Sequence, residues 1–515
     1  MRRNAMSAAQ LGCSSMGQGM GEAQAPETVP RTASGVPGLD TVLNGGFVEG
    51  GVYIVQGDPG SGKTILANQI CYKHIEGGGR VLYVTLLAES HSRLLQQLGT
   101  LSFFDQAAVS DQIVYVSGFT TLEEDGLPGL LNLLRREIKG RKATMLVLDG
   151  FLATQASASS ERDFKKFIHD LQGQVAAAGC TTFLLTNDDG RASRPERTMV
   201  DGIVQMVRRP SGDRTERYLE VVKLRSSAFL EGRHAYSIDS DGYHVHPRFE
   251  ALYATPSRHD DVGEDRYTTG APSLDAVIGG GLRTTSTSAV IGPSGAGKTT
   301  IGIQFIGAST PEEPGLLFGF YETPPRLKVK AKRIGVDLDA LTASGAVEIL
   351  WQAPTEPVFD ALGHRLVDAV RRRKVKRLLV DGLGGFIAAA SEPSRISRFF
   401  AALANELRVL GVTTLYTMET RDLFGAQVEV PIDNISSLVE NLLYMRFVER
   451  QSRMARILAI VKMRDSDFDP ALREYTIDDS GIHIGQPFVG AEALMTGFAH
   501  ESASEPRPAP LPPRA

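Results

Sequence analysis

The sequence predicts an α/β protein with two tandem domains, each built on a mostly parallel β-sheet flanked by helices. Two observations lead to this fold class. A glycine-rich motif that begins at Gly57 returns at Gly292, 235 residues later. In each copy, short apolar runs alternate with segments of helical pattern, and this alternation is typical of parallel strands joined by helical crossovers.

The elements of the first copy follow one another in a regular order. VYIVQG (52–57) is a predicted strand that leads into the glycine-rich loop, and TILANQICYKHIEGG (64–78) is a predicted helix that ends in glycines. The runs VLYVTLL (81–87), MLVLD (145–149) and TTFLLTN (181–187) are predicted strands of the same sheet. Their unbroken apolar pattern indicates burial on both faces, which is typical of a parallel sheet.

The similarity between the two copies extends far beyond the loop. ASGVPGLDTVLNGGF begins at Ala33, and its counterpart TTGAPSLDAVIGGGL begins at Thr268, again 235 residues later. Toward the end of each copy, EVVKLR and AIVKMR place lysines at positions 223 and 462, which are 239 residues apart. An offset that changes so little across a whole domain indicates a tandem duplication. The chain of 515 residues is also too long for one core, whereas two domains of about 230 residues fit.

The composition along the chain predicts the domain boundaries. The stretch SRHDDVGEDR is polar and separates the two copies, and the last residues are rich in proline. We expect a disordered tail over residues 1–30, a first domain over 31–256, a linker over 257–266, a second domain over 267–490 and a Pro-rich disordered tail over 491–515.

Overall composition argues against several classes of partner. The net charge of −5 is mild, so a nucleic-acid partner is not expected. The three cysteines, Cys13, Cys71 and Cys180, lack metal-ligand spacing and are few for a disulfide framework, so a reducing, cytoplasmic setting is expected. No run of about 20 apolar residues occurs, so no contact with a membrane is expected.

Each glycine-rich motif fits G-x-x-x-x-G-K-[ST], the phosphate-binding loop or P-loop. The glycines let backbone N–H groups turn toward phosphates, the lysine reaches the β- and γ-phosphates, and the threonine hydroxyl ligates Mg²⁺. Each loop follows an apolar strand and opens a helix, as the motif requires. We therefore expect ATP and Mg²⁺ in both copies. The predicted binding residues are Gly57, Asp58, Pro59, Gly60, Ser61, Gly62, Lys63 and Thr64 in the first copy, and Gly292, Pro293, Ser294, Gly295, Ala296, Gly297, Lys298 and Thr299 in the second.

Each copy also supplies carboxylates for the metal and for the attacking water. Asp149 and Asp381 each end an apolar strand, where proteins with a P-loop hold Mg²⁺ through a carboxylate. Together with the P-loop threonines, Thr64 and Thr299, they are the predicted metal-binding residues. Glu89 in LAES and Glu322 in FYET stand where the next strand leaves the sheet, near the expected γ-phosphate. A solvated loop position would also suit a glutamate, but these two residues are our candidates for orienting the attacking water.

With these residues assembled, the chain resembles the KaiC family of RecA-like ATPases over about residues 30–490. The resemblance rests on the opening G-x-P-x-L-D-x-[VI]-[LI]-x-G-G of each copy, the paired P-loops and the paired K-x-R strands. It implies RecA-like P-loop domains, ATP hydrolysis and a homo-hexameric double ring with ATP bound between subunits. Lys223, Arg225, Lys462 and Arg464 match family residues that reach a neighbour's nucleotide, where the charge of the transition state favours an extra cation.

The chain departs from the family pattern in two places. The family has adjacent glutamates at the catalytic position, whereas the sequence comparison pairs Ala88 with Tyr321 at the first of these positions and leaves Glu89 and Glu322 at the second. Hydrolysis with a single glutamate is still expected, as in simpler RecA-like ATPases. The C-terminal tail is short and Pro-rich, so the resemblance does not extend to the family's usual clock regulators, and protein partners are not predicted.

The resemblance also implies different roles for the two copies. In KaiC the second domain phosphorylates an adjacent pair of its own hydroxyl residues, and Ser436 and Ser437 match that pair. The first copy has Arg197 and Thr198 at the corresponding place. The second copy is therefore a candidate serine autokinase, and the first a hydrolysing domain that holds the ring together. Alternatively, the two serines simply begin a helix or a strand.

Three functions follow from these features. The first is a KaiC-like P-loop ATPase with serine autophosphorylation that acts as a signalling or timing module. The second is a DNA-recombination ATPase of the RecA class, which the run RRRKVKR (371–377) could suggest. However, RREIKGRK (135–142) stands at the same place in the first copy, and cations are expected at helix C-termini. The third is a nucleotide-gated scaffold with little turnover, which Ala88 and Tyr321 favour.

Overall fold

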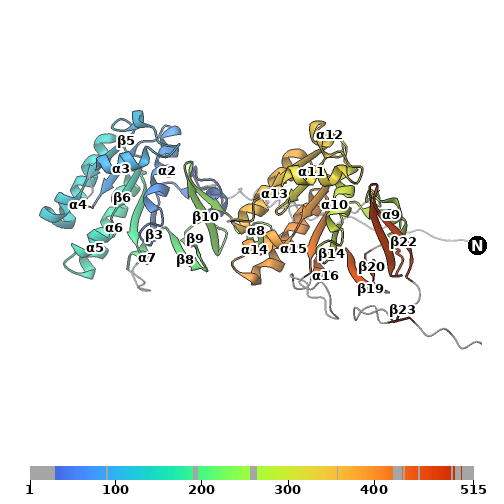
Figure 1. Ribbon diagram of the computed structural model, residues 1–515. Helices are drawn as coiled ribbons and strands as arrows, with labels where there is room; N and C mark the ends of the chain where they lie inside the picture. Colours follow the sequence, from blue (N-terminus) through green and yellow to red (C-terminus); the bar gives the residue numbers. More distant parts are fainter. Residues whose placement is uncertain are drawn as a thin grey trace, which may run out of the picture.

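The two domains have the same architecture and follow one another along the molecule (Figure 1). Each contains a nine-stranded, mostly parallel sheet with helices on both faces, which confirms the predicted fold class. A computed structural model of the chain describes residues 29–87, 91–188, 195–255, 264–355, 358–420, 432, 435–450, 453–464, 466–488, 491–492 and 500–501.

The sheet of the first domain has the strand order β11-β10-β9-β8-β3-β7-β6-β4-β5. The strands from β8 to β5 in this order are parallel, and β9, β10 and β11 extend the sheet in antiparallel fashion. Every residue of β3 and β4 is buried, because helices cover both faces. The strands are β3 (Val52–Gly57), β4 (Val81–Thr85), β5 (Ile113–Ser117), β6 (Met145–Asp149), β7 (Thr181–Asn187), β8 (Gly202–Ser211), β9 (Arg214–Leu224), β10 (Arg233–Asp239) and β11 (Gly242–His246).

The helices of the first domain form two layers, one on each side of the sheet. One layer shares an apolar core with the sheet and contains α1 (Leu39–Val42), α2 (Lys63–Glu76) and α3 (His91–Leu98). The other layer contains α4 (Phe119–Arg141) and α6 (Glu161–Ala177). The remaining short elements are β1 (Arg31–Thr32), β2 (Phe47–Val48), the 3₁₀ helix η1 (Gln106–Ala108), α5 (Leu152–Ala156), α7 (Pro195–Met199) and α8 (Phe249–Leu252).

The second domain repeats this plan with the strand order β16-β15-β17-β18-β14-β19-β20-β21-β22. Its strands are β14 (Thr287–Gly292), β15 (Gly315–Gly319), β16 (Val347–Trp351), β17 (Arg377–Asp381), β18 (Thr413–Glu419), β19 (Asn441–Arg450), β20 (Arg453–Met463), β21 (Arg473–Asp478) and β22 (Gly481–Pro487). Its helices are α9 (Pro272–Val277), α10 (Lys298–Gly307), α11 (Pro324–Lys332), α12 (Leu338–Ala343), α13 (Phe359–Arg373), α14 (Gly384–Ala389), α15 (Pro393–Val409) and α16 (Ile435–Leu438). The short strands β12 (Arg266–Tyr267) and β13 (Leu282–Arg283) pair with each other, as do β23 (Ala491–Glu492) and β24 (His500–Glu501).

The helix α8 comes from the end of the first domain but packs into the core of the second. The side chain of Phe249 is 0% exposed, and its ring centroid lies 4.9 Å from that of Phe399 on α15. The backbone N–H of Phe249 donates to Asp360 at 3.0 Å, and Glu250 forms a bidentate ion pair with Arg395 at 2.8 and 2.9 Å. The two domains are therefore joined by a buried contact that precedes the linker expected at residues 257–266.

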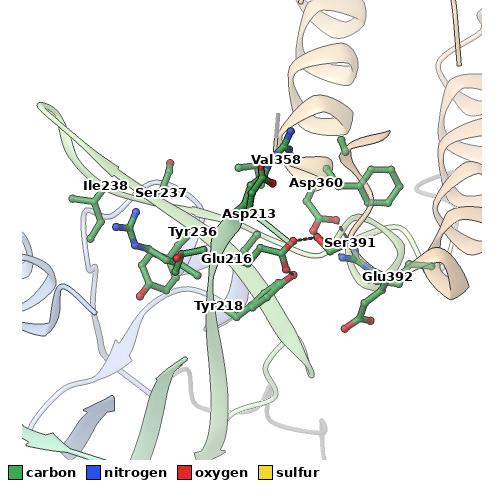
Figure 2. A pocket seen from close by; sticks show the side chains of 17 residues that line it. Asp213, Glu216, Tyr218, Tyr236, Ser237, Ile238, Val358, Asp360, Ser391 and Glu392 are labelled. Atoms are coloured by element: carbon green, nitrogen blue, oxygen red, sulfur yellow. Dashed lines mark hydrogen bonds and ion pairs between the residues drawn. The ribbon is translucent and has the colours of Figure 1, made fainter. Parts of the chain in front are cut away.

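A cavity of roughly 390 Å³ lies beside this joint, between β9 and β10 of the first domain and the beginnings of α13 and α15 (Figure 2). Glu216 accepts a hydrogen bond from Ser391 across the cavity. Tyr236 also lines the cavity, and its hydroxyl donates to the carbonyl of Ser61 in the first P-loop at 2.8 Å. This cavity therefore lies behind the first P-loop and belongs to the domain joint.

Within the described residues, no helix combines the length and the apolar character that crossing a membrane would require.

Candidate nucleotide-binding sites

The first P-loop connects β3 to α2, as the motif requires. Gly60 and Gly62 have positive φ angles of 76° and 91°, which residues with a side chain rarely adopt, so these two glycines set the turn of the loop. The Nζ atom of Lys63 donates to the carbonyl oxygens of Gly57 at 2.8 Å and Asp58 at 3.0 Å. Burial lowers the pKa of Lys63 from its usual value. The ammonium group therefore lies within the curve of the loop, where phosphates bind in P-loop proteins.

The predicted metal-binding pair of the first domain comes together at the end of β6. The hydroxyl of Thr64 donates to Asp149 Oδ2 at 3.1 Å, and the hydroxyl of Tyr83 donates to the same oxygen at 2.8 Å. Burial raises the pKa of Asp149, while these hydrogen bonds partly oppose the increase. A hydroxyl and a carboxylate oxygen are the protein ligands that Mg²⁺ takes in P-loop sites. Sequence reasoning assigned Tyr83 only to a buried strand and missed its contact with this site.

The second P-loop, between β14 and α10, repeats the arrangement. Lys298 Nζ donates to the carbonyl oxygen of Pro293 at 2.7 Å. Asp381 Oδ1 accepts hydrogen bonds from the hydroxyls of Thr299 at 3.2 Å and Thr417 at 2.6 Å. Burial is the main cause of the raised pKa of Asp381, and the charge of Glu322 raises it further. Sequence analysis did not identify Thr417 as part of this site, although Thr417 stands near the end of β18, at the same edge of the sheet as Asp381.

A cavity of roughly 430 Å³ opens in front of the second P-loop. The Nζ atom of Lys330, on α11, lies 2.7 Å from Glu322 Oε1, and both side chains line this cavity. Glu322 thus shares a cavity with the P-loop lysine and the metal-binding pair, although its role in orienting water stays a prediction. The full lining is Ser294, Gly295, Gly297, Lys298, Thr299, Thr300, Tyr321, Glu322, Lys330, Asp381, Gly382, Gly384, Thr417, Met418, Glu419 and Ile477.

The strand register defines which residues of the two domains are equivalent near the expected γ-phosphate. Leu87 and Tyr321 each stand two residues beyond the strand partner of the metal-binding aspartate. Each also packs over the glycine that follows that aspartate. Leu87 is therefore equivalent to Tyr321, whereas the sequence comparison pairs Ala88, which lies outside the described residues, with Tyr321. Glu89 itself lies outside the described residues, and its role stays a prediction.

The lysines expected to reach a neighbouring subunit hold short helices within this chain. Lys223 Nζ donates to three carbonyl oxygens in and just after α7, at 2.7 to 3.1 Å. Lys462 Nζ donates to the carbonyl of Ser436 within α16 and to that of Val439 just after it. Arg225 likewise donates to carbonyls of α7, and Arg464 is exposed just after β20. Cations are favourable at helix C-termini. The role of these residues toward a neighbour's nucleotide stays a prediction.

The candidate phosphoacceptors lie on the surface of the second domain. Ser436 and Ser437 are exposed on α16, which Ile435 anchors through its buried side chain. The corresponding helix of the first domain is α7, which contains Arg197 and Thr198. The alignment of the two copies at this point is therefore confirmed by equivalent helices, whereas phosphorylation of the serines is not tested by the fold.

The three arginines at the end of α13 all approach acidic side chains. Arg371 pairs with Glu406 at 2.7 Å, and Arg372 pairs with Glu348 at 2.7 Å. Arg373 also approaches Glu348, at 3.4 Å. These contacts partly neutralise the three arginines, which weakens the case for a surface that binds nucleic-acid phosphates.

These observations define a class of protein. Two successive parallel sheets each carry a P-loop, and each P-loop threonine meets a carboxylate at the end of a nearby strand. This combination is that of a tandem P-loop ATPase.

Comparison with known proteins identifies the family. The family model for the KaiC ATPase matches residues 32–250 and 267–488, and the chain therefore belongs to the KaiC ATPase family. The circadian clock oscillator protein KaiC of Parathermosynechococcus lividus is 24% identical over 91% of this chain and 88% of its own length. The circadian clock protein KaiC3 of Synechocystis sp. is 24% identical over 92% of this chain and 95% of its own length.

Proposed function

We propose that this KaiC-family ATPase binds and hydrolyses ATP with Mg²⁺ in both domains and acts as a cytoplasmic signalling or timing module. The observation that carries the proposal is the cavity of the second domain, where Lys298, Thr299, Asp381 and Glu322 meet. In P-loop enzymes these residue types supply the cation for the phosphates, the ligands for the metal and the carboxylate that orients water.

The threonine–aspartate pairs suit Mg²⁺ by their chemistry. Thr64 with Asp149, and Thr299 with Asp381, offer a hydroxyl and a carboxylate oxygen at 3.1 and 3.2 Å from each other. Both carboxyls are buried and have a raised pKa, so a nearby divalent cation would stabilise their charged form. The ion would in turn neutralise charge on the phosphate oxygens. The threonines and aspartates would hold it in place.

We further propose that the chain assembles into a homo-hexameric double ring. Among the described residues that line the second cavity, the only basic side chains are Lys298 and Lys330. Phosphoryl transfer commonly uses an additional arginine, which can come from a neighbouring subunit. Arg464 of a neighbour would supply it in the second ring and Arg225 in the first, each beside its partner lysine. Relatives named KaiC support this arrangement, but the single chain does not test it.

The second domain is our candidate for serine autophosphorylation. Ser436 and Ser437 are exposed on α16, and Lys462 from the adjacent strand holds the carbonyl of Ser436. Transfer requires a hydroxyl held in line with the γ-phosphorus, which is mainly a matter of positioning. In a ring, the neighbour's cavity would present the γ-phosphate to this face. Glu322, which lines that cavity, is our candidate to accept the hydroxyl proton.

A second candidate, a nucleotide-gated scaffold, is favoured for the first domain by one observation. The register aligns Leu87 with Tyr321, and the residue that follows Leu87 in the sequence is Ala88 rather than a glutamate. Unless Glu89 takes over from one position further on, the first domain would bind ATP and turn it over slowly. The DNA-recombination function has less support, because the arginines at the end of α13 pair with Glu406 and Glu348.

One experiment separates these functions. The purified chain is incubated with Mg²⁺ and ATP labelled on the γ-phosphate, and both released phosphate and label retained on the protein are measured over time. Release together with retention supports the ATPase and autokinase. Release alone removes the kinase but leaves the ATPase. Tight binding of ATP without release or retention would support the scaffold and overturn the proposed hydrolysis.

A further inference from the structure

A groove of roughly 720 Å³ runs along the outer face of the first domain, between α4 and α6. Its floor is apolar and shallow, with Leu131 and Ile138 on one side and the small residues Gly173 and Ala177 on the other. The complete lining is Pro128, Leu131, Asn132, Arg135, Ile138, Lys139, His169, Asp170, Gly173, Gln174, Ala177 and Ala178.

The groove has an equivalent in the second domain, between α13 and α15. The helices α4 and α13 end in the same way, with Lys142 and Lys374 in the left-handed conformation at φ 53°. The helices α6 and α15 are followed by Gly179 and Gly411, at φ 61° and 76°. Both pairs of residues are 232 positions apart. One constant offset therefore relates every residue of the first groove to a residue of the second.

In the second domain, the equivalent groove is filled by α8. Gly363 is the residue of the second domain that is equivalent to Leu131. A Cβ atom at Gly363 would come within 2.8 Å of the ring of Phe249. The position of Lys139 is that of Arg371, whose guanidinium lies 5.6 Å from the ring centroid of Tyr253, just after α8. In the second domain, the residues at these positions contact α8 or Tyr253 just after it. In the first domain, the equivalent residues line an open groove.

A buried polar atom also marks the open groove. Glu406 is the residue of the second domain that is equivalent to Gln174. Glu406 accepts a hydrogen bond from Arg371 at 2.7 Å. In the first domain, Gln174 Oε1 is buried and has no hydrogen-bond partner among the described residues. Unpaired buried acceptors are uncommon in folded proteins. This one is explained if a further segment of chain supplies a donor.

The course of the chain indicates which segment this is. In the second domain the groove is filled by the chain that precedes the domain, because Tyr253 stands 13 residues before β12 begins at Arg266. The segment that precedes the first domain is residues 1–28, outside the described part of the chain. The carbonyl of Pro30 accepts from the N–H of Glu49 at 3.0 Å, and the adjacent Gly50 donates to Thr181 at 3.0 Å. The tail therefore joins the domain beside the end of α6, where the groove also ends.

The sequence of this tail suits an apolar groove. No charged residue occurs between Arg3 and Glu22, and the apolar residues Met6, Leu11, Met16 and Met20 are separated by small or neutral ones. Methionine adapts its shape to irregular apolar surfaces. The run Ser7-Ala8-Ala9-Gln10 has the pattern of a capping box, and Met6 and Leu11 stand where a hydrophobic staple is formed. A short helix can therefore begin here, as α8 does in the second domain.

We infer that residues 6–20 dock in the groove between α4 and α6 of the same chain, as α8 docks between α13 and α15. The tail then covers the outer face of the first domain and supplies a donor to Gln174. This inference does not depend on ATP hydrolysis or on phosphorylation.

The natural thiol of Cys13 makes the docking testable by cross-linking. Cys71 and Cys180 are buried and burial raises the pKa of both thiols, so they react slowly. We would introduce a second thiol in the full chain by Ala177→Cys, in the groove, or by Gly140→Cys, on an exposed turn of α4 with open space around it. A short bifunctional maleimide should join Cys13 to the groove thiol about tenfold faster than to the control thiol. Without docking, the tail would bring Cys13 to both thiols at a similar effective concentration, so a difference in rate reports docking.

The alternative results are equally distinct. Equal rates of cross-linking for the two variants would overturn the inference, since they would reflect the tether alone. A cross-link between two chains, seen as a covalent dimer, would overturn it in favour of an exchange between copies. If Ala177→Cys disturbs folding, Gly173→Cys probes the same groove from the preceding turn of α6 and leaves Gln174 in place. Replacing Leu11 and Met16 by Asp should abolish the preference for the groove thiol while leaving the control rate unchanged.

Discussion

Lys330 and Glu322 form an ion pair in the second nucleotide cavity, with Lys330 Nζ 2.7 Å from Glu322 Oε1. The lysine is on α11, and the glutamate follows β15, so the pair ties the helix to the edge of the sheet. The two side chains are 38% and 35% exposed, which leaves them accessible from the cavity. Lys330 therefore limits the orientations that the Glu322 carboxylate can adopt and adds a positive charge to the site.

We expect Lys330→Met to slow hydrolysis in the second domain, because Glu322 would lose its fixed orientation. Glu322→Gln, measured in parallel as release of phosphate, defines the share of turnover that depends on this carboxylate. Lys330→Met should remove most of the same share. The control is Lys328→Met on the same helix, since Lys328 pairs with Asp339 at 2.7 Å and does not line the cavity. Equal effects of the two lysine variants would contradict a specific role for Lys330.

The double variant Glu89→Gln, Glu322→Gln should lower ATP turnover by about 100-fold or more, the usual contribution of a positioned general base. The single variants should differ, because the register aligns Leu87 with Tyr321. Glu322 directly follows Tyr321 in the sequence, whereas Glu89 stands two residues after Leu87. We expect Glu322→Gln to cost more than Glu89→Gln. Turnover is measured as phosphate release from assembled protein. Unchanged turnover in the double variant would mean that another residue orients the water.

Phosphate from ATP should appear on the peptide that contains Ser436 and Ser437. The first-domain peptide with Arg197 and Thr198 is an internal control, because its short helix occupies the equivalent position. Peptide mass spectrometry after incubation with ATP and Mg²⁺ detects either product. If the serine peptide stays unmodified in an assembled ring loaded with ATP, the autokinase is excluded and the plain ATPase remains.

Assembly should depend on nucleotide. Lys223, Arg225, Lys462 and Arg464 are predicted to contact a neighbour's ATP. Arg464 is exposed and is not among the described residues that line the P-loop cavity of its own domain. We expect rings in native mass measurements with ATP and Mg²⁺ and smaller species without them. A monomer under both conditions would remove the basis for these contacts.

The two P-loops should contribute unequally to this assembly. From the division of roles in the family, Lys63→Ala should weaken the ring more than Lys298→Ala does. The same mass measurement, made over a range of protein concentrations, compares the two variants. Equal loss of assembly would argue that both domains hold the ring.

The buried carboxyl of Asp381 should make stability depend on pH. Its pKa is raised above the value of 3.8 for an exposed aspartate, so the nucleotide-free folded chain holds this proton more tightly than the unfolded chain does. The free energy of unfolding should therefore fall as pH rises from about 3.8 through the raised pKa. Above that window, Asp381→Asn should increase the unfolding temperature without nucleotide, because the amide keeps an acceptor for Thr299 and Thr417.

The same variant should respond less to ligand. If Asp381 binds the Mg²⁺ of the nucleotide, Asp381→Asn should show a smaller rise in unfolding temperature on addition of ATP and Mg²⁺ than the unmodified chain. Thermal unfolding at several pH values, with Asp339→Asn as an exposed control, measures both effects. An undiminished response to ATP and Mg²⁺ would show that Asp381 does not take part in binding.

The regular elements could be predicted because their physical causes are local. The strand VYIVQG is buried along its whole length, and the glycines of the loop after it have the positive φ angles that the motif requires. The metal-binding pairs followed from the rule that parallel strands end at one edge of the sheet. Because the duplication repeats each of these features, each could be recognised in both copies of the sequence.

The features that sequence reasoning missed depend on contacts between distant parts of the chain. A helical pattern does not reveal that Lys330, among the several lysines of α11, turns into the nucleotide cavity. Motif matching paired Ala88 with Tyr321, whereas the strand pairing, counted from the aspartates, aligns Leu87 with Tyr321. Polar composition placed the linker after residue 256, although the core of the second domain already includes Phe249.

The burial of Phe249 also bears on how the two halves of this chain can be exchanged or expressed apart. A fragment that begins at the polar stretch after residue 256 would lack this ring, and Phe399 would lose one of its ring contacts. Loss of a fully buried phenylalanine costs about 3–5 kcal/mol, a large part of the stability of a domain. The portable unit is therefore longer than the repeat visible in the sequence, and a fusion or swap should be cut before Pro247 rather than at the linker.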